Sequence, residues 1–143
     1  MAKFVATGID ELNAALKHAG GLDEETIEKM LFAAGDEIVD ELQKATRSSG
    51  FRTQEYAQHI RYAKNVKRDK TDSPYITISV NGKNAHGTRR AMVLFILNYG
   101  RREKPGQIHG TFFWTRGTKS AESRAQKKIE EIQNQKLKER GLI

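Results

Sequence analysis

The sequence contains no cysteine among its 143 residues. This absence excludes a disulfide framework, a thiolate nucleophile and any zinc or iron–sulfur site with cysteine ligands. Long apolar runs are also missing: the longest, Ala91 to Leu97, has seven residues, whereas a membrane-spanning helix needs about 18 or more. We therefore expect no membrane span, and a stability that comes from packing alone.

The N-terminal residues lack the apolar core and the cleavage signal of a secretory leader, which predicts a cytoplasmic protein. With 37% hydrophobic and 30% charged residues, the chain has the composition of one soluble globular domain. Within this single domain, residues 1–143, we expect an acidic helical part (1–46), a basic part of strands and loops (47–117) and a C-terminal helix (118–141).

Charge is distributed unevenly along the chain. Residues 1–46 hold 4 basic and 10 acidic side chains, whereas residues 47–104 hold 13 basic and 4 acidic ones, and the net charge of the whole chain is +7. Such asymmetry favours binding to a charged partner. The alternative is a solvated basic surface without a specific ligand.

Two helices are predicted before residue 50. Thr7 can cap a short first helix that ends at Gly20 and Gly21, and Asp23 can cap a second one that runs to about Thr46. The second helix has an apolar stripe at spacings of three and four, formed by Ile27, Leu31, Ala34, Ile38, Leu42 and Ala45. Gly35 within it marks either close packing against another element or mere tolerance.

Alternating patterns predict a small antiparallel sheet in the middle of the chain. Residues 53–60 favour one or two helical turns, residues 60–66 alternate apolar with polar, and residues 75–80 alternate strictly with β-branched side chains. The two strands would be joined through residues 67–74. The resulting fold class is α+β, with long helices packed on a small antiparallel sheet and a helix at the C-terminus.

The last third of the chain is harder to assign. Residues 90–99 are too uniformly apolar for periodicity to decide between strand and helix, and we favour a short helix that stops at Gly100. Residues 101–110 predict an exposed basic loop. Thr118 or Ser120 can then cap a final helix with a narrow apolar stripe. We expect this loop to be anchored where it returns to the core, by Tyr99, Gly100, Phe112, Phe113 and Trp114.

The residues do not predict an enzyme, a metal site or a cofactor. No two of the four histidines have the i, i+4 spacing of helical metal ligands. Acidic residues fall on one helical face, opposite the apolar stripe, at Asp36, Glu37, Asp40 and Glu41. A magnesium-dependent nuclease would need such carboxylates to converge in a pocket, so a solvated face is the simpler interpretation.

Basic residues cluster in three stretches: Lys64, Lys67, Arg68 and Lys70; Arg89 and Arg90; Arg101, Arg102 and Lys104. On one surface they could bind DNA through its phosphates, with an affinity that falls as salt rises. They could equally dock an acidic protein surface, including the acidic row of a neighbouring copy. No sequence-reading motif for DNA accompanies them.

The second half of the chain has a recognisable order of features: a strand with Ile76, Ile78 and Val80, an apolar run closing with Asn98, Tyr99 and Gly100, a polar loop, the pair Phe112 and Phe113, and a charged terminal helix. This order resembles the tail-completion, or neck, protein family of long-tailed bacteriophages. The resemblance covers roughly residues 50–135 and leaves out the first helix. That family commonly has an acidic residue in the place of Asn98 and Pro-Phe in the place of Thr111-Phe112.

The resemblance implies an α+β virion protein without catalysis. Copies of it would assemble into a ring, usually of six, at the head-proximal end of the tail, between the tail terminator and the head connector. The genome passes through such a ring, so transient contact with DNA is also implied. The protein would reside in the virion, and in the host cytoplasm during assembly. A basic DNA-binding accessory protein is the alternative.

Overall fold

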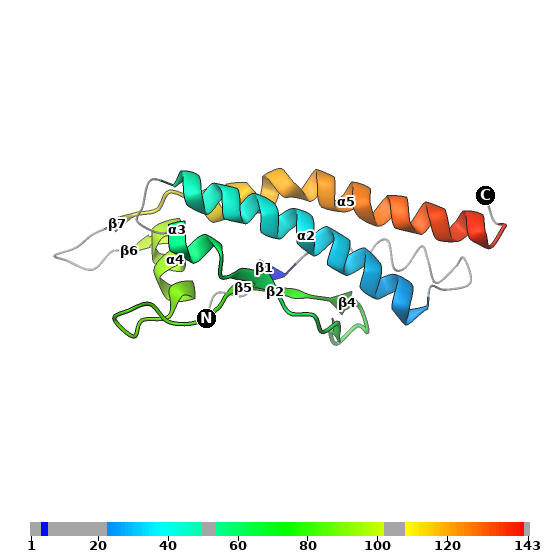
Figure 1. Cartoon of the computed structure of the whole chain (residues 1–143), viewed down its shortest axis with the longest axis horizontal. Coiled ribbons are helices and arrows are strands. Elements are labelled where there is room, and N and C mark those ends of the chain that lie inside the picture. The colour runs from blue at the N-terminus through cyan, green and yellow to red at the C-terminus, as the bar shows by residue number, and fades with distance from the viewer. Residues whose placement is uncertain (1–3, 6–22, 50–53, 102–107, 142–143) are drawn as a thin grey trace.

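The computed structural model describes residues 4–5, 23–49, 54–101 and 108–141. Figure 1 shows two long helices, α2 and α5, lying side by side along the molecule, with the short strands and helix α4 to one side of them. The elements in chain order are β1 (Phe4–Val5), α2 (Glu24–Ser48), α3 (Gln54–Ala57), β2 (Ile60–Tyr62), β3 (Lys67–Arg68), β4 (Pro74–Tyr75), β5 (Thr77–Val80), α4 (Arg90–Tyr99), β6 (Gly100–Arg101), β7 (Ile108–His109) and α5 (Phe113–Glu139). The expected α+β class is confirmed.

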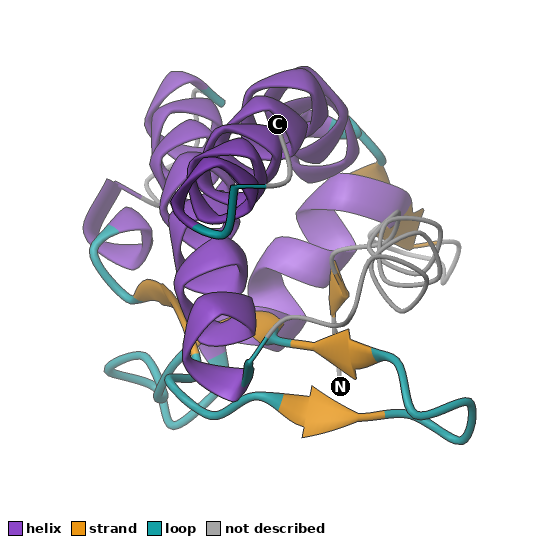
Figure 2. Ribbon diagram, turned by 90° about the vertical axis from the view of Figure 1, so that its right-hand side faces the viewer, coloured by secondary structure: helices purple, strands orange, loops and turns teal. Residues whose placement is uncertain are grey.

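The main sheet has three antiparallel strands in the order β1-β5-β2. Strand β5 lies at its centre, with Ile78 opposite Phe4 on one side and opposite Tyr62 on the other. The predicted pairing of the two middle strands is therefore confirmed, although β2 stops at Tyr62 and residues 75–80 divide into β4 and β5 at Ile76. Strand β1 was not predicted, and the helix expected from Thr7 to Gly20 lies outside the described residues. Figure 2 shows strands, in orange, lying below the two long helices.

Helix α2 follows its sequence signals closely. Its N-cap is Asp23, whose carboxylate accepts a hydrogen bond from the Thr26 amide at 3.1 Å, and its predicted stripe forms the core from Ile27 to Leu42. Gly35 packs against the sheet: a Cβ at this position would lie 2.8 Å from Ile76 Cδ1 and 2.9 Å from Tyr62 Cδ1. Of the two explanations for this glycine, close packing is the one that the structure supports.

Helix α5 begins earlier than predicted. It starts at Phe113 and not at Thr118 or Ser120, and its N-cap, Phe112, has a left-handed backbone (φ 54°) and forms no side-chain capping bond. The expected apolar stripe is present, with Ala121, Ala125 and Ile129 buried against α2. The extra turn adds Phe113 and Trp114 to the same core.

Helix α4 confirms the helical alternative for residues 90–99, and Gly100 forms its C-cap. Only Leu94 and Asn98 in it are fully buried. The expected loop after α4 is flanked by two short strands, β6 and β7. They pair as an antiparallel hairpin in which Gly100 lies opposite His109. The hairpin brings the chain back to α4, where the Thr111 amide donates to Leu97 O and the Phe112 amide donates to Asn98 O, at 3.1 and 3.0 Å.

Candidate functional site

The basic residues singled out in the sequence lie, where the structure describes them, at two ends of the molecule. Lys64, Lys67, Arg68 and Lys70 lie on and around strands β3 and β4, whereas Arg89, Arg90 and Arg101 lie at the two ends of α4, at the opposite end of the molecule (Figure 1). Arg102 and Lys104 are outside the described residues. The described basic residues therefore form two separate groups and not a single basic face.

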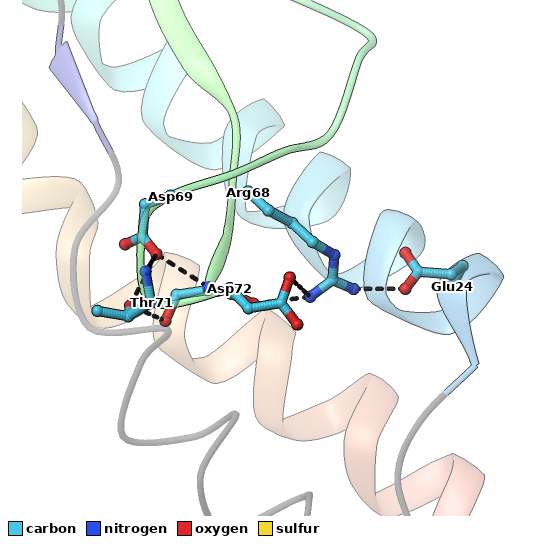
Figure 3. A network of polar contacts seen from close by, with 6 residues as sticks. Glu24, Arg68, Asp69, Thr71 and Asp72 are labelled. Atoms are coloured by element: carbon cyan, nitrogen blue, oxygen red, sulfur yellow. Dashed lines mark hydrogen bonds and ion pairs between the residues drawn. The ribbon is translucent and has the colours of Figure 1, made fainter.

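Arg68 is engaged in the fold. Its guanidinium pairs with the Glu24 carboxylate at the start of α2 and donates to the Asp72 carbonyl oxygen at 2.8 Å. The turn beyond it is closed by Asp69, which accepts hydrogen bonds from the Thr71 hydroxyl and amide and from the Ser73 amide (Figure 3). These bonds, that of the Thr71 hydroxyl first, hold the pKa of Asp69 below its ordinary value. Arg68 thus ties the β3–β4 hairpin to α2.

The lysines beside Arg68 have a different environment. Lys64, Lys67 and Lys70 are exposed. Three ammonium groups on one short stretch can attract an anionic surface, but they lack the fixed geometry with which a guanidinium binds a carboxylate or phosphate. This stretch therefore offers charge for steering rather than a built binding site.

Arg90 is also part of the fold. Its guanidinium donates to the Asn81 carbonyl oxygen at 3.1 Å and lies over the ring of Tyr56, 5.9 Å from the ring centre. The side chain fastens the start of α4 to the turn after β5. Of the other cations at this end, Arg89 and Arg101 are exposed.

The acidic row on α2 faces partners within the same chain. Glu37 and Glu41 are half-buried and form ion pairs with Arg124 of α5, at 3.9 and 2.5 Å. Asp36 accepts from the Tyr62 hydroxyl at 2.9 Å, and Asp40 pairs with Lys44 at 3.1 Å. Burial, and then the bond to Asp36, raises the pKa of Tyr62 to about 12. The row is thus tied to α5 and the sheet, and its role towards a neighbouring copy stays a prediction.

The expected aromatic anchors divide into two kinds. Phe113 and Trp114 are buried in the core, in keeping with an anchoring role. Tyr99 and Phe112 are exposed and contact each other edge to face, so their role as loop anchors stays a prediction. Phe112, the N-cap of α5, has a left-handed backbone, and the next residue, Phe113, enters the core.

Asn98 is the anchor that the sequence did not reveal. Its buried side chain accepts from the amides of Trp114 and Thr115 at 3.0 and 3.2 Å and donates to the Thr115 hydroxyl at 3.0 Å. The amides of a first helical turn have no partner within their own helix. A side chain from α4 therefore caps α5, which explains why α5 can begin without a capping residue of its own.

An exposed apolar patch covers the end of the molecule where α4 meets α5. Its members are Met92 (54% exposed), Phe95 (46%), Tyr99 (47%) and Phe112 (48%). The rings of Phe95 and Tyr99 lie 4.8 Å apart, and those of Tyr99 and Phe112 lie 6.2 Å apart, edge to face. The signal was present in the sequence as the i, i+3, i+7 spacing of Met92, Phe95 and Tyr99, but it was hidden within a wholly apolar run.

No group of three histidine, aspartate or glutamate side chains among the described residues could hold a metal ion. A shallow groove of about 260 Å³ lies between the end of α2 and the start of α5, and it is lined by Ser48, Ser120, Glu41 and Arg116 among others, with no histidine among its lining residues. The helices in the described ranges include none that is long and apolar enough to cross a membrane.

A scan against protein-family models matches residues 10–94 to the family described as "Bacteriophage HK97-gp10, putative tail-component". The matched stretch covers more than half of the chain and ends within α4. It shares residues 50–94 with the neck-protein resemblance, but it also includes the N-terminal segment that the resemblance left out. Searches of the curated proteins and of the solved structures give no match.

Proposed function

The chain belongs to the HK97 gp10-like family of bacteriophage tail components, and we propose that within the tail it is a non-enzymatic tail-completion or head–tail joining subunit. Membership makes it a structural tail protein of the virion, in contact with other virion proteins. In this role, copies of the protein form a ring at the head-proximal end of the tail, between the tail terminator and the head connector. The resemblance to neck proteins implies six copies.

The family match over residues 10–94 carries this proposal. Two features of the described residues support it. The most exposed large apolar side chains gather on one face at one end of the molecule, as expected for a protein that docks another. The polar residues singled out in the sequence are occupied with holding the fold together, through Arg68, Arg90 and Glu41, and not with a catalytic constellation.

The test is a phage that lacks this gene. Electron microscopy of its lysate should show filled heads and finished tails that are not joined, and purified protein added to the lysate should restore joined, infectious particles. Antibody labelling of complete virions should place the protein at the head-proximal end of the tail. Normal virions without the gene, or labelling along the tube or at the distal tip, would rule out the neck role.

A DNA-binding accessory protein is the second candidate, and the exposed Lys64, Lys67 and Lys70 favour it. Its affinity for random duplex DNA should fall with salt, with a log–log slope that becomes shallower by about 0.9 for each phosphate that the protein no longer neutralises. Changing all three lysines to Ala should produce that change, whereas Lys44→Ala, which removes a lysine paired with Asp40, serves as the control. Equal slopes for the two variants would remove the case for this function.

A further inference from the structure

The exposed patch of Met92, Phe95, Tyr99 and Phe112 is held in place by the fold around it. Met92, Phe95 and Tyr99 follow one another at three- and four-residue spacings along α4, so they are neighbours on its surface. Phe112 joins them because its amide donates to Asn98 O while the Asn98 side chain caps the next turn of α5. The rings thus present a preformed surface, which lowers the ordering cost of binding.

The chain segment that carries this patch has charges of nearly one sign. Residues 73–121 contain eight basic side chains and one acidic one, a net charge of +7, and the rest of the chain has 17 of each. The segment that includes α4 and the start of α5 therefore carries a net charge equal to that of the whole protein. Arg101 directly follows α4, and Arg116 lies one turn beyond Phe112 on α5, where it also lines the groove between α2 and α5; both are exposed.

The exposed apolar rings and the positive charge together indicate what kind of partner binds this patch. Two copies meeting patch to patch would bring two cationic ends together, and like charges across an interface disfavour that pairing. Duplex DNA would match the charge but would leave the aromatic rings without a surface to pack on, since its bases are stacked inside. A protein face with an apolar centre and an acidic rim satisfies both properties at once.

We propose that the patch formed by Met92, Phe95, Tyr99 and Phe112 docks an apolar, acid-rimmed face on a different protein of the virion. The inference rests on the proposed function for the identity of that partner as a virion protein. Phe95 and Tyr99 supply the contact area at the centre, as aromatic residues do at binding hot spots. Arg101 and Arg116 supply the orientation and the rate of encounter.

Photo-crosslinking in phage-producing cells tests the proposal. p-Benzoylphenylalanine replaces Phe95, whose exposure lets the larger ring be accommodated, and replaces exposed Lys127 on α5 as the matched control. Position 95 should give a cross-link, stronger than that of the control, to a peptide of another virion protein that has Asp or Glu residues nearby. Arg101→Glu combined with Arg116→Glu should lower its yield at least tenfold.

Other cross-linking results overturn the proposal: an adduct to a second copy of this chain, an adduct to DNA, a yield no higher than at position 127, or a yield indifferent to the charge reversal. Phe95→Ala with Tyr99→Ala should also reduce restored joined particles at least tenfold while the melting temperature stays near that of the wild type. If wild-type protein restores no particles, the neck role alone fails, because the cross-link is measured on the protein itself. If both variant and wild type restore particles equally, the docking surface is wrong and the neck role stands.

Discussion

Replacing Asn98 by Ala should destabilise the protein through the junction of α4 and α5. The side chain is fully buried, and its oxygen satisfies two amides of the first turn of α5. Loss of a capping side chain costs about 0.5–2 kcal/mol, and a further buried amide left without a partner costs about 1–3 kcal/mol. The two costs together predict a loss of about 1.5–5 kcal/mol, which for a chain of this size is a fall in Tm of roughly 5–15 °C.

Trp114, the single tryptophan, makes this prediction measurable at the site itself. It is buried, and its amide is one of the two that Asn98 accepts from. Urea unfolding followed by tryptophan fluorescence and by circular dichroism should show a lower midpoint with an unchanged slope, as expected when stability alone changes. A loss under about 0.5 kcal/mol, well below the usual cost of a missing cap, would refute the capping role of Asn98.

Asn98→Asp provides the matched control. The carboxylate keeps both acceptor positions, the Thr115 hydroxyl can donate to it, and the positive end of the α5 macrodipole favours a negative charge. This variant should retain clearly more stability than Asn98→Ala at neutral pH. It is also the acidic residue that the resemblance to neck proteins expects here. If Asp is as destabilising as Ala, the amide's donated bond and not its oxygen holds the junction.

Three further predictions concern α2 and the sheet. Gly35→Ala gains about 1 kcal/mol of helix propensity but places a Cβ against Ile76 and Tyr62, which costs about 1–3 kcal/mol; urea melts should show a net loss, and a gain would contradict the close packing. The raised pKa of Tyr62, about 12 against 10.0, stabilises the fold fully below pH 10 and is lost as pH rises towards 12. Tyr62→Phe should therefore lose less stability over that range, and the phenolate absorbance that this substitution removes should be the part that titrates near 12. Hydrogen bonds from the first turn of α2 lower the pKa of Asp23 from 3.8, so its contribution is present above that value and lost as pH falls below it. Asp23→Asn should remove that acid-dependent loss in thermal melts, and an unchanged acid profile would exclude Asp23 as its source.

Local signals predicted the elements whose determinants lie within a few residues. Helix α2 has its cap at Asp23 and its stripe within one segment, so both its start and its buried face were predictable. The same holds for β5, whose Ile76-to-Val80 alternation predicted which side chains are buried, and for α4, which ends at Gly100 as expected. In each case the backbone is specified by the residues that form it.

The features that could not be predicted depend on distant partners. Helix α5 begins five residues before Thr118 because Asn98, on another helix, caps it. Adjacent Phe112 and Phe113 have opposite exposures, and residue type alone cannot show which of two neighbouring phenylalanines is buried. A charge count from the sequence includes Arg68 as a free cation, yet its guanidinium pairs with the carboxylate of Glu24, 44 residues away.

The division of the sequence into an acidic first part and a basic remainder has a different interpretation once these ion pairs are known. The acidic row of α2 holds α5 through Arg124, so it contributes less to an external surface than its sequence implies. What remains is a cationic, apolar end at α4 and a remainder of zero net charge. If identical subunits form the proposed ring, contacts between neighbours away from the cationic α4 ends avoid repulsion between like charges. The cationic ends would all be free to point the same way along the tail, where an unlike, acidic protein can cover them.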